Sequence, residues 1–159
     1  MIDAAEFFPA AGAYSVPAPA RRARLLAGLN QLTAHHAQAC PAYRRILDAM
    51  GWNAAPAAAL ADVPFLPAQL FKRIRLASVP EPDVLRLLHS SGTSGQAPSQ
   101  IVLDRATADR QGRALGHIMR EFLGPRRWPM VIVDEPIRDA RGGFTARGAG
   151  QLGFVPFGR

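Results

Sequence analysis

The first half of the chain carries hydrophobic residues at helical spacing. Leu25, Leu29 and Leu32 recur three or four positions apart, which places them on one face of a helix. Pro19 suits the first turn of this helix, because a proline lacks the N–H that would find no intrahelical partner there. The pattern therefore predicts a helix over about residues 20–37.

A second helical face follows directly along the chain. Its members are Tyr43, Ile46, Leu47 and Met50. Pro41 suits the first turn, and Gly51 suits the end, where glycine readily adopts the left-handed conformation. We expect a helix over 41–50, followed by a loop over 52–70 that several prolines interrupt.

Two short apolar runs in the middle of the chain predict strands, over residues 84–89 and 100–104. The segment between them consists mainly of small and polar residues and is about ten residues long. The loops of most hairpins have only two to five residues. The extra length favours a role for this segment beyond joining two strands.

The last third of the chain predicts one more helix and one more strand. A helix over 107–123 would bury an apolar face, with Thr107 as its N-cap and Gly124 at its end. The apolar run at 129–134 is bounded by prolines and is typical of a buried strand, for example in a parallel sheet. Residues 138–151 contain four glycines and are expected to be irregular.

These elements together predict an α/β fold, in which a helical N-terminal region precedes a mixed sheet. Residues 1–20 are rich in alanine and proline and are expected to form an irregular arm. The remainder, 21–159, has the size of one domain.

The composition narrows the class of protein. The formal net charge is +7, from eighteen arginines and one lysine against 12 acidic residues. No dense basic run or known nucleic-acid motif accompanies this charge, so a nucleic-acid-binding protein is the least favoured reading. The single cysteine, Cys40, excludes an internal disulfide, and no Cys/His spacing predicts a metal site. The chain shows no signal-peptide pattern and no apolar run of ~20 residues, so we expect a soluble, cytoplasmic protein.

The segment between the two predicted strands has the chemistry of a phosphate-binding loop. Its candidate binding residues are Ser90, Ser91, Gly92, Thr93, Ser94 and Gly95. Glycines let the backbone approach a ligand closely, successive backbone N–H groups can hold an anion, and hydroxyls donate further hydrogen bonds. The segment matches neither the Walker A pattern nor the dinucleotide-binding pattern, and a plain turn remains the alternative.

Six segments extend this pattern along the chain: 40–44, 63–67 with 71–72, 90–95, 101–105, 129–134 and 144–150. In this order they resemble the adenylate-forming enzymes. The similarity is to the acyl-protein synthetase (LuxE) branch and, less closely, to phenylacetate-CoA ligases.

The resemblance implies that the carboxylate of a fatty acid or a similar acid attacks the α-phosphate of ATP. This gives an acyl-adenylate and pyrophosphate, and the acyl group then passes to a thiol. It also implies that residues 90–95 hold the β- and γ-phosphates and that Mg²⁺ accompanies the nucleotide.

The chain departs from the family pattern in two ways. Many adenylate-forming enzymes have a lysine just after the loop, where this chain has no cation at 96–99, and Lys72 and Arg105 are the nearest alternatives. The downstream adenine-binding and catalytic segments have no counterpart, so 21–159 is expected to form the N-terminal part of an adenylate-forming domain, incomplete alone. A split subunit and a non-catalytic interaction module are the alternatives. Expected macromolecular partners are the missing C-terminal portion, a partner subunit or a second copy of the chain.

Overall fold

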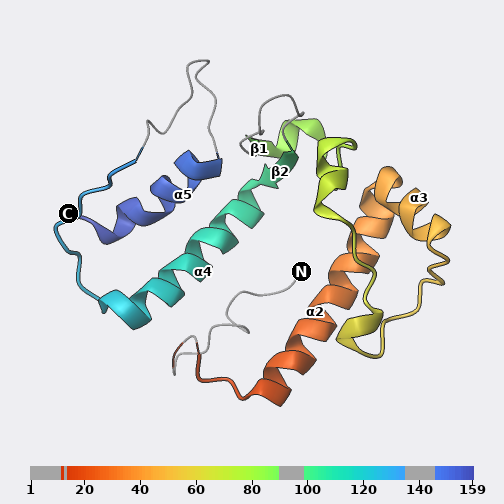
Figure 1. Ribbon diagram of the computed structural model, residues 1–159, viewed down its shortest axis with the longest axis horizontal. Coiled ribbons are helices and arrows are strands. Elements are labelled where there is room, and N and C mark those ends of the chain that lie inside the picture. Colours follow the sequence, from red (N-terminus) through yellow and green to blue (C-terminus); the bar gives the residue numbers. More distant parts are fainter. Residues whose placement is uncertain (1–11, 13, 90–98, 135–145) are drawn as a thin grey trace.

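The computed structural model describes residues 12, 14–89, 99–134 and 146–159 (Figure 1). Its main elements in chain order are α2 (Ala18–Ala39), α3 (Pro41–Ala49), β1 (Val84–His89), β2 (Gln100–Asp104), α4 (Arg105–Leu123) and α5 (Ala146–Phe154). Short 3₁₀ helices lie between them. The hairpin of β1 and β2 lies between the α2–α3 pair and the α4–α5 pair (Figure 1).

The two predicted N-terminal helices are confirmed as α2 and α3. Cys40 separates them with an extended backbone, and Pro41 then begins α3. The helices pack against each other, and Leu47 between them is completely buried. Pro41 limits α2 because the ring of a proline clashes with a continuing helix but is tolerated in a first turn.

The end of α3 has the geometry expected of a glycine stop. Gly51 has a φ of 75°, its N–H donates to Asp48 O at 3.0 Å, and the N–H of Trp52 donates to Leu47 O at 3.0 Å. These two bonds form a Schellman motif, which satisfies carbonyls that the helix end leaves without partners.

The two predicted strands are confirmed, and they form an antiparallel pair. His89 lies opposite Gln100, and Val84 lies opposite Asp104, with an irregularity between Val84 and Arg86. In the described part of the chain this pair is the whole sheet, so the predicted mixed sheet is not found there.

The predicted start of α4 was wrong. The helix begins at Arg105, directly after β2, and Asp104 rather than Thr107 is the N-cap. The Asp104 carboxylate accepts a hydrogen bond from the Thr107 backbone N–H at 2.8 Å. Aspartate is among the best N-capping residues, and here the strand ends on it. The helix ends before Gly124, as expected, with a φ of 71° at this glycine.

The predicted strand at 129–134 is also not found. Only Trp128 forms a β-bridge, to Gly158, and the side chains of Val131 and Val133 are 87% and 93% exposed. An apolar run becomes a buried strand only where a neighbouring strand offers a free edge, and none of the described strands lies there. Within the segment expected to be irregular, residues from 146 onward form α5 instead.

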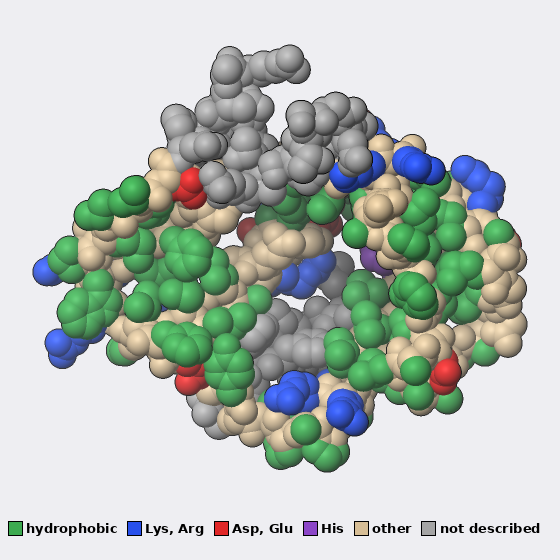
Figure 2. Space-filling view, in the orientation of Figure 1, with side chains coloured by type: hydrophobic (Ala, Val, Ile, Leu, Met, Phe, Trp, Pro, Cys, Tyr) green, Lys and Arg blue, Asp and Glu red, His purple; other side chains and the backbone are tan. Residues whose placement is uncertain are grey.

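The described residues bury few side chains completely. The buried apolar ones are Ala37, Cys40, Leu47 and Leu103. Hydrophobic side chains gather on the surface over the α4–α5 side of the molecule (Figure 2). Among the exposed ones are Phe122, Trp128 and Val131. Exposed apolar surface of this kind commonly marks a binding surface.

Candidate functional site

The β1–β2 hairpin fixes both ends of the predicted phosphate loop. Because His89 and Gln100 are paired across the ladder, the chain leaves β1 and enters β2 at adjacent points. The predicted binding residues Ser90, Ser91, Gly92, Thr93, Ser94 and Gly95 lie outside the described residues. The described flanks therefore show only that β1 ends and β2 begins at paired residues, His89 and Gln100.

Lys72, one of the two candidate cations, ends the 3₁₀ helix η2 (Ala68–Lys72). This helix lies against β2, the strand that leaves the loop, and the Lys72 side chain is half-buried. The structure thus brings the element that carries Lys72 to the side of the hairpin. α5 lies against the other strand, β1.

Arg105, the second candidate cation, lies at the opposite end of the hairpin. It follows Asp104, whose partner Val84 is the first residue of β1. At a rise of about 3.4 Å per residue, the five steps along the chain from Gln100 to Arg105 span about 17 Å of backbone. The side chain of Arg105 is exposed and lines a shallow hollow together with Asp83 and Val84.

Asp104 keeps its negative charge next to Arg105. Hydrogen bonds from the Thr107 side chain and then from its backbone N–H lower the pKa of the Asp104 carboxyl below its usual 3.8. The Thr107 hydroxyl in turn accepts a hydrogen bond from the Arg110 guanidinium at 2.8 Å. This chain of hydrogen bonds fixes the junction between β2 and α4.

A second polar cluster is centred on His36 of α2. His36 Nδ1 and Ser78 Oγ are 2.7 Å apart, and the rings of His35 and Tyr43 contact the His36 ring. Burial, and secondly the charge of His35, lowers the pKa of His36 below 6.5. No local sequence pattern shows this cluster, because Ser78 is 42 residues away from His36 in the chain.

Cys40 is a free cysteine at the junction between α2 and α3. Its side chain is only 3% exposed. The described residues hold no group of three His, Cys, Asp or Glu side chains arranged to bind a metal ion. In the same part of the chain, no helix is both long and apolar enough to cross a membrane.

Comparison with protein families assigns the chain to one class of protein, the acyl-activating ligases. The family model described as "Acyl-protein synthetase, LuxE" matches residues 8–154, which is nearly the whole chain. The chain therefore belongs to the LuxE acyl-protein synthetase family. No similar curated protein and no similar solved structure was found.

Proposed function

We propose that this chain supplies the ATP-phosphate-binding part of an acyl-activating ligase, as the N-terminal part of an adenylate-forming domain. In this reaction a carboxylate attacks the α-phosphate of ATP, the bond to the β-phosphate breaks, and pyrophosphate leaves. The observation that carries the proposal is the family match over 8–154, which includes the whole Ser/Thr/Gly segment.

The hairpin supports the role of the loop. The paired residues His89 and Gln100 hold its two ends together. The hydrogen-bonded strands β1 and β2 can therefore serve as a fixed base that positions a bound phosphate. Transfer of an adenylyl group depends mainly on positioning and on neutralising charge at the leaving group. A loop of backbone N–H and hydroxyl donors on a fixed base is suited to hold the β- and γ-phosphates.

Mg²⁺ fits this proposal as a companion of the nucleotide. It commonly binds through substrate phosphates, water and only one or two carboxylates, so the site needs no dedicated protein cage. The ion would neutralise phosphate charge. The residues of this chain would hold and orient the triphosphate.

The test is calorimetric titration of the full chain with Mg·ATP, with pyrophosphate and AMP as competitors. If the loop holds the β- and γ-phosphates, pyrophosphate competes with ATP and AMP competes poorly. Gly92→Val combined with Gly95→Val should weaken ATP binding at least tenfold, because added side chains block the close approach of the backbone.

The matched control is Gly112→Val, on the exposed surface of α4, where an added Cβ meets no atom within 4 Å. This variant should bind ATP as the unchanged chain does. Equal affinities of the double loop variant and the control would overturn the role of the loop, and so would competition by AMP but not by pyrophosphate.

A further inference from the structure

One corner of the molecule, the α4 corner, consists of residues 120–128 at the end of α4 and residues 155–159. Arg127 Nε–H donates to Pro156 O at 3.0 Å, and the next residue, Trp128, forms a β-bridge to the same stretch. These contacts join the two stretches, so their side chains share one surface.

Three apolar side chains of the α4 corner are open to solvent. Phe122, Trp128 and Val155 are each at least half-exposed. The indole N–H of Trp128 donates to Leu123 O at 3.0 Å. It therefore keeps an acceptor when the ring enters apolar surroundings, which avoids the cost of an unsatisfied donor.

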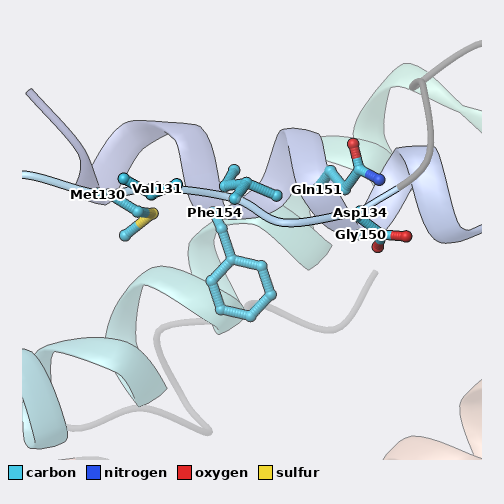
Figure 3. A pocket seen from close by; sticks show the side chains of 7 residues that line it. Met130, Val131, Asp134, Gly150, Gln151 and Phe154 are labelled. Atoms are coloured by element: carbon cyan, nitrogen blue, oxygen red, sulfur yellow. The ribbon is translucent and has the colours of Figure 1, made fainter.

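The apolar surface continues from this corner into a groove between α5 and residues 130–134. A Cβ at Gly158 would lie 3.3 Å from Met130 Cβ, so the Met130 end of the groove adjoins the corner. In Figure 3, Met130 and Phe154 lie toward one end of the groove, and Asp134 lies at the other. The acidic side chain of the groove is therefore at the end away from the corner.

Arginines lie among the exposed apolar side chains of the α4 corner. In Figure 2, Lys and Arg side chains border the hydrophobic ones at the left edge, over the end marked C in Figure 1. The acidic residue of the corner is Glu121, whose Oε1 would be 2.9 Å from a Cβ at Gly12. The corner thus combines apolar side chains with a surplus of positive charge. Its exposed arginines are Arg120, Arg126, Arg127 and Arg159.

We propose that the α4 corner docks on an anionic phospholipid bilayer. Phe122 and Trp128 enter the interfacial region of the bilayer, where aromatic rings are favoured, and the arginines contact the lipid phosphates. Surfaces of this kind bind through buried apolar area together with attraction to anionic lipids, and the corner offers both. This inference adds a membrane surface as a partner and does not depend on the proposed nucleotide binding.

Charge favours a bilayer over a second copy of the chain as the occupant. Two copies that met through this corner would bring their arginines together, and the whole chain has a formal net charge of +7. Like charges across a contact oppose association. A nucleic acid would also attract the arginines, but the aliphatic side chain of Val155 suits hydrocarbon better than a phosphate backbone.

The test is sedimentation of the full chain with two kinds of vesicle, one of phosphatidylcholine alone and one in which about a third of the lipid is phosphatidylglycerol. The chain should bind the mixed vesicles and bind the neutral ones at least about tenfold more weakly. Raising the salt from about 0.1 M to about 1 M shortens the screening length from about 10 Å to about 3 Å and should release the bound chain.

Arg126→Gln combined with Arg127→Gln should weaken binding to the mixed vesicles at least about tenfold, because each arginine near an anionic surface contributes about fivefold. Arg44→Gln combined with Arg45→Gln is the matched control, an adjacent exposed pair on α3, across the molecule from the corner (Figure 1). Each pair contains one arginine that donates a surface hydrogen bond. The control should bind within about twofold of the unchanged chain. Arg126→Lys combined with Arg127→Lys keeps the charge and should retain binding.

Phe122→Ser tests the apolar part of the surface, with Phe65→Ser as its matched control. The side chains of Phe122 and Phe65 are 71% and 78% exposed, and Phe65 lies in the loop after α3. Phe122→Ser should weaken binding to the mixed vesicles at least about fivefold, because its ring no longer leaves water. Phe65→Ser should bind as the unchanged chain does. Since both side chains are exposed, neither substitution is expected to unfold the protein.

Trp128 reports the contact directly, because it is one of two tryptophans in the chain. In a Trp52→Phe background, Trp128 is the remaining one. Its fluorescence emission should shift to shorter wavelength with the mixed vesicles and stay unchanged with the neutral ones.

Equal losses for the two glutamine pairs, or for Phe122→Ser and Phe65→Ser, would overturn the proposal, as would an equal loss for the lysine and glutamine pairs at 126 and 127. Equal binding to neutral and mixed vesicles, or binding to neither, would also overturn it. In a chain that binds no vesicles, a dimer that Phe122→Ser dissociates would assign the corner to self-association. Retention of a single-stranded oligonucleotide that requires Arg126 and Arg127 would then assign it to nucleic acid.

Discussion

Gly153 of α5 lies so close to Leu115 of α4 that a Cβ at Gly153 would be only 2.8 Å from Leu115 Cδ2. Real Cβ atoms essentially never come this close to another heavy atom. The glycine therefore permits the approach of the two helices. This contact joins α5 to α4.

The contact predicts that Gly153→Val destabilises the protein. Overpacking typically costs about 1–3 kcal/mol, and the loss here should be at the lower end of that range or below it, because Leu115 Cδ2 is the end of a flexible, partly exposed side chain that can move aside. Gly112→Val is the control, because it makes the same change on α4 where a Cβ meets no atom within 4 Å. Since glycine is the poorer helix former, the control should be neutral or slightly stabilising. Urea denaturation of both variants measures the difference, and equal midpoints would show that the helices separate without cost.

The same contact explains why α5 could not be predicted from the sequence. Glycine disfavours a helix by about 1 kcal/mol relative to alanine, and this helix contains three glycines: Gly148, Gly150 and Gly153. Local propensity therefore indicated a loop. α5 contacts β1, and its Gly153 lies next to Leu115, which is nearly forty positions earlier, and no local pattern shows either contact.

The elements predicted correctly have signals that act within a few residues. Pro41 and Gly51 mark the limits of α3 because each restricts its own backbone, and β1 and β2 follow from short apolar runs. The run at 129–134 shows the opposite case. Its composition suits a strand, but pairing needs a neighbouring edge, and composition does not reveal whether one is present.

The N-cap of α4 predicts a pH-dependent contribution to stability. Asp104→Ala should cost about 1 kcal/mol, because the Thr107 N–H loses its acceptor. The folded-state pKa of Asp104 lies below 3.8, so this contribution is present above that pH and is lost as the pH falls through the lower folded value.

Asp104→Asn is the control for this effect, since asparagine caps a helix about as well as aspartate but does not titrate. Chemical denaturation between about pH 2 and pH 7 should show that the asparagine variant lacks the acid loss of the unchanged chain. Identical acid profiles of the two proteins would contradict the assignment of the lowered pKa.

The His36–Ser78 pair predicts that stability falls in mildly acidic solution. Because the folded-state pKa of His36 lies below 6.5, the unfolded chain binds a proton first as the pH decreases. The free energy of unfolding should therefore decrease as the pH falls below about 6.5, and should level off below the folded-state value. Denaturation midpoints measured from about pH 5 to pH 8 give this slope.

His36→Gln should remove the slope contributed by this residue. His35→Gln should retain it in reduced form, because the charge of His35 is the smaller of the two causes that lower the pKa of His36. If the slope persists unchanged in His36→Gln and disappears in His35→Gln, then His35 and not His36 causes the pH dependence, and the prediction is wrong.

The candidate site could be predicted only as far as its chemistry is contiguous in the sequence. The loop at 90–95 shows its small and hydroxyl-bearing residues in one stretch. A groove lined by Met130–Ile132 and Asp134 has its second wall, which includes Gln151 and Phe154, about twenty residues later on a helix that the sequence did not predict. Likewise, His36 and Ser78 are brought together only by the path of the chain between α3 and β1. The residues of these sites come together only in the folded chain, whereas the residues of the loop are already adjacent in the sequence.

The position of Arg105 predicts that it contributes little to ATP binding. The backbone of β2 places it about 17 Å from Gln100, the residue at the base of the loop. At an ionic strength of about 0.15 M, charges are largely screened beyond about 8 Å. Arg105→Gln should therefore change the affinity for Mg·ATP by less than about twofold at this salt concentration.

The comparison is the tenfold loss expected for the Gly92→Val, Gly95→Val double variant, measured by the same titration. At about 0.01 M salt, where screening extends to about 30 Å, a modest loss should appear. A tenfold loss in Arg105→Gln at the higher salt concentration would instead show that the guanidinium reaches the bound phosphates directly.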